Sequence, residues 1–165
     1  MKLCSAILCA LVAISVPAVA GQPAAAKPAA QKAAPAAKGE PRTIELTATE
    51  QMKYDKTRLT ARPGEKIRVV LKAVGAMPKM AMAHNFVLLK PDASALEVNN
   101  AAFNARATDF IPESQKDKII AFTPLAGGGE TVEVTFTAPK AGTYPFLCTF
   151  PGHFTQGMKG TLVVQ

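Results

Sequence analysis

Residues 144–160 read YPFLCTFPGHFTQGMKG and carry three side chains that bind soft or borderline metal ions. Cys148, His153 and Met158 lie within one short loop, and an apolar run flanks that loop on each side. Short apolar runs bounded by Gly and Pro turns are typical of β-strands. The stretch therefore predicts a hairpin-like loop between two strands, with three potential ligands held by the protein scaffold and not by the metal.

The ligand types and the number of histidines restrict the metal. A thiolate, an imidazole and a thioether together suit copper better than any hard cation. Two imidazoles and one thiolate in a plane, with a weak axial thioether, serve Cu(I) and Cu(II) in nearly the same geometry. The chain has 2 histidines, so the second imidazole can come only from His84, in the segment MAHNFVL. The candidate copper site uses every histidine present.

Each of these residues alone has an ordinary structural explanation. A single His84 is more often a structural histidine, and a lone Cys148 is more often a small buried hydrophobic residue. Met158 alone would be a core side chain. Their occurrence together, at this spacing, is what favours the metal site.

Residues 1–20 have the pattern of a secretory signal peptide. Lys2 is followed by an apolar run over residues 3–16, and Ala18-Val19-Ala20 forms an A-x-A cleavage site before Gly21. A retained membrane anchor is the competing reading, but the apolar run is too short to span a bilayer. We expect an exported or periplasmic protein with no transmembrane segment after cleavage.

Residues 21–41 are nearly all Ala, Pro, Lys and Gln, a composition that predicts a disordered linker. Loss of the signal peptide would remove Cys4 and Cys9, so Cys148 would be the one remaining cysteine and no internal disulfide is expected. A lone thiol in an oxidising compartment is a buried structural residue, a nucleophile or a metal ligand. The neighbouring residues must decide among these roles.

The formal net charge is +7 and the pI is about 9.5. The sequence has no basic patch interleaved with aromatic residues, so we do not expect nucleic acid as a partner. Attraction to an acidic partner or an anionic membrane surface is one interpretation of the charge, and a solvated basic surface is the other.

From residue 42 onward the sequence consists of short alternating or apolar runs. The predicted strands cover residues 43–48, 58–61, 66–72, 85–90, 118–122, 130–137, 143–150 and 160–165. A short helix is expected between Ser94 and Ala107, and Tyr144 is expected to form a tyrosine corner. The pattern predicts an all-β protein, an antiparallel Greek-key β-sandwich or barrel with a short helical insertion, over residues 42–165. Segments distant in sequence meet at one pole of such a sandwich.

Five stretches resemble a known family. CTFPGH at 148–153, followed by MKGTLVV at 158–164, closely resembles the C-terminal motif of azurins, and MPKMAMAHNFVL at 77–88 resembles their first-histidine segment. The similarity extends to EQMKYDKTRLTA at 50–61 and IIAFTPLAGGGE at 119–130. The chain thus resembles a cupredoxin, a type 1 blue copper protein of the azurin/auracyanin type, over most of its predicted domain.

The resemblance implies one copper ion per domain, with His84, Cys148 and His153 as equatorial ligands and Met158 as the axial ligand. It further implies that Asn85 ties the two ligand loops together. Backbone N–H groups of Asn85 and Phe150 would bond the Cys148 sulfur and tune the copper centre.

The sequence departs from the azurin pattern at three points. Azurins have one residue fewer between the last histidine and the methionine, and the four-residue spacing here is like that of plastocyanins and auracyanins. Ala83 stands where azurins have a glycine whose carbonyl is a second weak axial contact. The azurin disulfide has no counterpart in residues 42–165, whose one cysteine is Cys148.

The function that we expect is transfer of single electrons between redox proteins by an exported blue copper protein that is not an enzyme. The expected partners are transient: c-type cytochromes, or copper or haem reductases and oxidases. The resemblance also implies an apolar collar around the exposed edge of His153, where partners dock. The collar residues that we expect are Met82, Phe150, Pro151 and Phe154.

Two other functions agree with parts of the sequence. Met77, Met80 and Met82 crowd the approach to His84, where they could be part of a docking patch or ordinary loop packing. As a thioether-rich Cu(I) site they would instead suggest a copper chaperone or storage protein. A thiolate ligand built into the fold argues against it, because delivery requires easy release. An enzyme with Cys148 as nucleophile and His153 as base is the third possibility, but no oxyanion-stabilising device or substrate pocket is evident.

Overall fold

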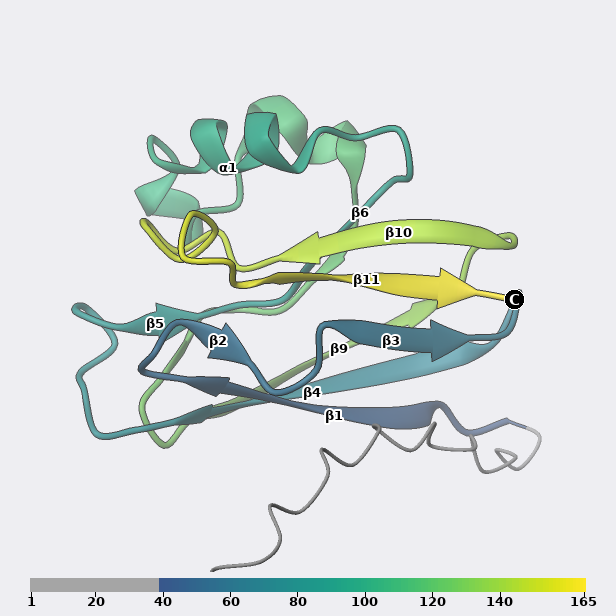
Figure 1. Cartoon of the computed structure of the whole chain (residues 1–165), viewed down its shortest axis with the longest axis horizontal. Coiled ribbons are helices and arrows are strands. Elements are labelled where there is room, and N and C mark those ends of the chain that lie inside the picture. The colour runs from purple at the N-terminus through teal and green to yellow at the C-terminus, as the bar shows by residue number, and fades with distance from the viewer. Residues whose placement is uncertain (1–38) are drawn as a thin grey trace, which may run out of the picture. The chain divides into compact units, whose positions relative to one another are not determined.

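The computed structural model describes residues 39–165, which form two packed β-sheets. The first sheet has the order β2-β1-β4-β9 and the second has the order β3-β11-β10-β6-β7 (Figure 1). The first sheet contains β1 (Arg42–Thr49), β2 (Lys53–Tyr54), β4 (Lys66–Val74) and β9 (Thr131–Thr137). The second contains β3 (Arg58–Ala61), β6 (Val87–Leu89), β7 (Ile119–Phe122), β10 (Gly142–Leu147) and β11 (Lys159–Val164). Two further short strands, β5 (Ala83–His84) and β8 (Ala126–Gly127), pair with each other.

The predicted all-β fold with a short helical insertion is confirmed. The signal peptide predicted for residues 1–20 and most of the linker predicted for residues 21–41 lie outside the described residues. The predicted strand 85–90 is shorter than expected, because β6 begins only at Val87 and His84 belongs to the separate strand β5.

The expectation that the strands are all antiparallel is wrong for two pairs. Strands β1 and β4 run parallel, with Leu46 opposite Leu71, and β11 runs parallel to β3. After β1 the chain forms β2, crosses to the second sheet as β3 and returns to the first sheet as β4. Alternation of apolar residues tells which face of a strand is buried but not the direction of its neighbour. The sequence pattern alone therefore does not distinguish these two directions.

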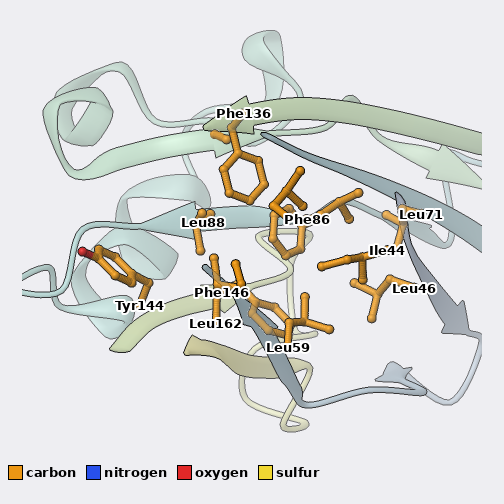
Figure 2. Close-up of a cluster of buried hydrophobic side chains, with 14 of the residues drawn as sticks. Ile44, Leu46, Leu59, Leu71, Phe86, Leu88, Phe136, Tyr144, Phe146 and Leu162 are labelled. Carbon is orange, nitrogen blue, oxygen red and sulfur yellow. The ribbon is translucent and has the colours of Figure 1, made fainter. Parts of the chain in front are cut away.

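The main core lies between the two sheets. In β1 and β4 every second residue is buried, because successive side chains of a strand point to opposite faces. Figure 2 shows Leu46 and Leu71 from the first sheet facing Phe146 and Leu162 from the second. Each large apolar side chain buried in this way contributes about 1.5–3 kcal/mol relative to its exposed state.

A smaller core lies under the helical insertion. Helix α1 (Ala95–Ala102) begins after Ser94, whose hydroxyl accepts a hydrogen bond from the Glu97 N–H at 3.3 Å, as expected of an N-cap. Two 3₁₀ turns follow, η1 (Arg106–Thr108) and η2 (Glu113–Lys118). The predicted helix is thus confirmed, but it ends at Ala102. In the described part of the chain no helix has the length and apolar character needed to cross a membrane.

The topology brings distant segments to one end of the sandwich. Figure 1 shows β5 and the turn between β10 and β11 at this end, and the C-terminus at the opposite end. The start of β10 lies near the C-terminus, where the Tyr144 hydroxyl donates to the Lys140 carbonyl at 2.8 Å. This contact is the expected tyrosine-corner bond. We refer to the two ends as the ligand pole and the far pole.

Candidate metal centre

Three of the predicted ligands lie on one closed turn at the ligand pole. Cys148 directly follows β10 and Met158 directly precedes β11, and these strands pair in antiparallel register up to Leu147 and Lys159. The Cys148 N–H donates to the Met158 carbonyl at 3.1 Å, and the Met158 N–H donates to the His153 carbonyl at 3.0 Å. The backbone of Met158 is therefore bonded to both other ligand-bearing residues, and its side chain is buried.

The local sequence explains the shape of this turn. Gly152 and Gly157 have φ values of 86° and 88°, a left-handed conformation that favours glycine. The Gln156 N–H bonds the Gly152 carbonyl at 3.3 Å, and the Gly157 N–H bonds the Phe154 carbonyl at 3.0 Å. One glycine stands just before His153 and the other just before Met158, so each side chain leaves the backbone immediately after a left-handed residue.

His84 reaches the same place from the other side. It lies in β5, opposite Ala126 of β8. The next residue of β8, Gly127, lets this strand pass close to Lys79, because a Cβ at residue 127 would lie 2.7 Å from the Lys79 Cβ. One ligand atom each from His84, Cys148 and His153 lies within 4.8 Å of the others. The Cys148 Sγ is 3.4 Å from His153 Nδ1, and the two imidazole centroids are 4.9 Å apart. The three predicted equatorial ligands therefore converge.

Asn85 joins the segment after His84 to the segment after Cys148. Its Nδ2 donates to Thr149 Oγ1 at 2.8 Å, and its Oδ1 accepts from the Thr149 N–H at 2.9 Å. Both residues are buried, so these bonds are shielded from competing water. Sequence reasoning named Asn85 but not Thr149, its partner.

Burial keeps the metal-free ligands uncharged near neutral pH. It raises the pKa of the Cys148 thiol to about 12, against the smaller opposing effect of the Asn85 and Phe150 backbone N–H groups. Burial and the neighbouring His84 lower the pKa of His153 to about 4. Burial also lowers the pKa of His84, partly offset by the Glu50 carboxylate. Both imidazoles are therefore uncharged at neutral pH, the protonation state in which a ring nitrogen can bind a metal ion.

The side chains present fit a copper ion. His84 Nδ1 is buried and, within residues 39–165, has no hydrogen-bond partner. Burial of a polar nitrogen without a partner destabilises the fold, so this atom is suited to bind a metal ion. The cluster contains two imidazoles and one thiol and no carboxylate, which is the donor chemistry of copper and not of magnesium or calcium.

The residues predicted to form an apolar collar are only partly accessible. Met82, Pro151 and Phe154 are half-buried. Phe154 packs against the smaller core, with the Lys159 ammonium 4.5 Å from the centre of its ring. His153 is only 2% exposed, so the expectation of an exposed imidazole edge is wrong. The Phe150 ring packs against the imidazole, with their centroids 4.9 Å apart. Ala83 is fully buried in β5.

A groove of about 420 Å³ lies beside Phe150. It is lined by Lys79, Met80, Ala81, Arg106, Asp109, Phe110, Leu125, Phe150 and Pro151. Phe110, which the sequence analysis did not single out, packs edge-on against Phe150 with centroids 5.3 Å apart. Asp109 and Phe110 have φ values of 53° and 60°, rare for residues other than glycine.

Mononuclear sites with two imidazoles and a thiolate at one pole of a two-sheet sandwich are the hallmark of the cupredoxins, and the fold and donor set place this chain in that class. Residues 42–165 match the family described as copper binding proteins of the plastocyanin/azurin family, and the chain belongs to that family. The predicted azurin/auracyanin relationship is thereby confirmed, and the chain is a blue copper electron carrier of this type.

Individual relatives agree with this assignment. Auracyanin-A of Chloroflexus aurantiacus is 44% identical over 128 residues, which cover 76% of this chain and 75% of that protein. The azurin of Bordetella pertussis is 34% identical over 125 residues, covering 73% of this chain and 81% of the azurin. Among solved structures, the "blue" copper protein auracyanin A has a TM-score of 0.68 at 43% identity, covering 76% of this chain and all of that one. Dithionite-reduced auracyanin of Roseiflexus castenholzii has a TM-score of 0.66 at 38% identity, covering 74% and 96%.

Proposed function

We propose that His84, Cys148 and His153 hold one copper ion, with Met158 as the axial ligand, and that the chain passes single electrons between other redox proteins. The observation that carries this assignment is the convergence of one ligand atom from each of His84, Cys148 and His153 within 4.8 Å. The fold brings these atoms together from two segments that are far apart in the sequence, β5 with His84 and the turn that carries Cys148 and His153.

The chain's own residues would keep the site nearly unchanged between oxidation states. Copper, when bound, supplies a one-electron couple between Cu(I) and Cu(II). The paired strands β10 and β11 fix both ends of the turn that carries three ligands, and the Asn85–Thr149 bonds fix the fourth. The backbone N–H groups of Asn85 and Phe150 stabilise a negative Cys148 sulfur, since both lower its pKa. Ala83 would contribute at most a weak carbonyl contact.

Partner proteins would approach at the ligand pole, over Met82, Pro151 and Phe154 and the adjacent groove. The groove is lined by two cationic side chains, Lys79 and Arg106, by the carboxylate of Asp109 and by apolar Phe110. Lys79 also pairs with Glu130 at 3.2 Å. A mixed apolar and charged surface of this kind suits a weak, transient encounter. The partners that we propose are transient redox proteins, such as c-type cytochromes or copper or haem reductases and oxidases. The predicted signal peptide supports an exported or periplasmic site of action.

The copper chaperone is the second candidate, and the exposure of two methionines favours it. Met80 is 83% exposed and Met77 is 40% exposed, so their thioethers are accessible to Cu(I). The ligand residues themselves are buried, which opposes rapid hand-over. The third candidate, a cysteine nucleophile, is disfavoured because Cys148 is fully buried and its thiol pKa is about 12. No catalytic activity is proposed.

Voltammetry and copper exchange on the full chain separate the two main candidates. We expect uptake of one equivalent of copper, a reversible one-electron wave, and slow loss of copper to a metal-free acceptor protein. Rapid hand-over of copper without a reversible wave would defeat the electron-carrier proposal and support the chaperone. Met80→Leu, which removes the most exposed thioether among residues 39–165, is the matched control and should change neither result.

A further inference from the structure

The hairpin formed by β1 and β2 contacts the segments that carry the copper ligands. Three side chains of this hairpin, Glu50, Lys53 and Tyr54, bond three different segments at the ligand pole. We call these three residues the hairpin brace. None of them is a candidate ligand, so direct binding of copper does not explain their contacts.

Tyr54 bonds the His84 side of the site. Its hydroxyl donates to the backbone carbonyl of Asn85, the residue that follows His84, and both groups are buried. The Tyr54 ring packs in the main core, with its centroid 5.6 Å from that of Phe146. The hydroxyl is thus held in place by a packed ring, and its loss would leave a buried carbonyl without this donor.

Lys53 bonds the other side. Its ammonium donates to the carbonyl of Gln156, in the turn between His153 and Met158. The same ammonium lies over Gly157, where an added Cβ would be 3.2 Å from it. Lys53 is solvent-exposed, so this bond is weaker than that of Tyr54.

Glu50 completes the brace. Its Oε1 accepts from the backbone N–H groups of Ala76 and Met77 at 2.8 and 2.9 Å, in the segment that leads to β5. This support matters because β5 has only two residues and pairs only with the two-residue strand β8. Few backbone hydrogen bonds between strands can hold His84 in place. The side-chain hydrogen bonds from Glu50 and Tyr54 therefore add support to the segment around it.

We propose that the hairpin brace positions the copper ligands, with Tyr54 fixing the His84 segment and Lys53 fixing the turn between His153 and Met158. The proposal rests on the proposed ligand set. These residues act through the backbone of the ligand segments and are positioning residues. Removal of partners that orient metal ligands typically costs about 10- to 100-fold in metal affinity.

The test compares Tyr54→Phe with Tyr144→Phe in the full chain. Each change removes one tyrosine hydroxyl that bonds a backbone carbonyl, the first at the ligand pole and the second at the far pole. We expect Cu(II) transfer to a chelator to be about 10- to 100-fold faster in Tyr54→Phe, with altered copper hyperfine splitting in its EPR spectrum. Tyr144→Phe should keep the wild-type rate and spectrum. Equal rates and identical spectra for the two variants would overturn the proposal.

Hydrogen exchange on the metal-free chain separates this proposal from the function itself. Tyr54→Phe should speed amide exchange around His84, and Lys53→Met should speed it in residues 156–158, whereas Lys53→Arg should restore protection. Lys56→Met is the matched control for Lys53, because Lys56 bonds the Glu45 carbonyl in β1 and no ligand segment. Failure of the wild-type chain to bind copper would refute the ligand set, and unchanged exchange in the Tyr54 and Lys53 variants would refute the brace.

Discussion

The side chain of Asn85 and the backbone and hydroxyl of Thr149 form a reciprocal pair of hydrogen bonds, 2.8 and 2.9 Å long, that links the two ligand-bearing segments. Asn85 follows His84 directly, and Thr149 follows Cys148 directly. The pair therefore fixes the spacing of two ligands that are far apart in the sequence.

Asn85→Ala should loosen the site and destabilise the chain. The change leaves the buried Thr149 N–H without its acceptor, and we expect a loss of about 2–4 kcal/mol in the free energy of unfolding. Denaturant unfolding measures that loss, and chelator exchange should show faster copper release. Asn99→Ala is the control, because Asn99 is buried in α1 and its Oδ1 has no partner within the described residues. Equal copper release in both variants would contradict the linking role.

Met158 should act both as a core side chain and as the axial ligand, and two substitutions separate these roles. Met158→Leu keeps the buried volume and should cost less than about 1.5 kcal/mol, whereas Met158→Ala leaves a cavity and should cost about 2–5 kcal/mol. Both variants lose the thioether, so both should stay blue and have a higher reduction potential than the wild type. A wild-type potential in Met158→Leu would show that the sulfur does not interact with copper.

Stability should fall in acid through the ion pair of Glu65 and Arg42, which is remote from the copper site. The Arg42 hydrogen bond holds the pKa of the Glu65 carboxyl below its ordinary value, with Arg62 contributing. A lowered folded-state pKa gives stability that is present above the unfolded-state pKa and lost as the pH falls through the folded-state pKa. Glu65→Gln should lower stability near pH 7 by about 1 kcal/mol or less.

The measurement is denaturant unfolding of the metal-free chain from neutral pH to about pH 3, a range that spans the ordinary carboxyl pKa. The difference in stability between the wild type and Glu65→Gln should shrink as the pH falls. A difference that stays constant over this range would contradict the assignment of the acid-sensitive contribution to Glu65.

Arg106 should favour negatively charged electron donors at the groove. Arg106→Glu reverses one charge in the groove lining, so the rate of reduction by hexacyanoferrate(II) should fall several-fold at low ionic strength. The effect should vanish at high salt. Lys140→Glu makes the same charge change in the loop that leads into β10 at the far pole and should have a much smaller effect. Stopped-flow measurement of the reduction rate in both variants tests this prediction. If the two variants slow reduction equally, electrons do not enter at the groove.

The sequence predicts the donor set well because the chain offers few choices. With 2 histidines in the whole chain, the convergence of His84 with Cys148 and His153 is nearly forced once copper chemistry is assumed. The strands are also predictable, because the sandwich buries one face of each. The alternation in β1 and β4 shows this directly.

Other features depend on long-range packing that no local pattern encodes. The parallel pairing of β1 with β4 follows from a crossover between sheets, and β2 is too short to produce a periodic signal. Phe110 contacts Phe150, 40 positions further along the chain, from a segment in which residues 109 and 110 have positive φ values that their residue types do not predict. The bond of Tyr54 to Asn85 joins residues 31 positions apart, and neither residue type predicts the other.

The most direct test of the central claim is the optical and EPR spectrum of the chain after addition of Cu(II), compared with that of Cys148→Ser. Ligation by His84, Cys148 and His153 predicts an intense blue thiolate-to-copper absorption band and narrow copper hyperfine splitting in the wild type. Both should be absent in the variant. A colourless protein with an ordinary tetragonal Cu(II) spectrum, or a blue band that survives the loss of the thiol, would contradict the site.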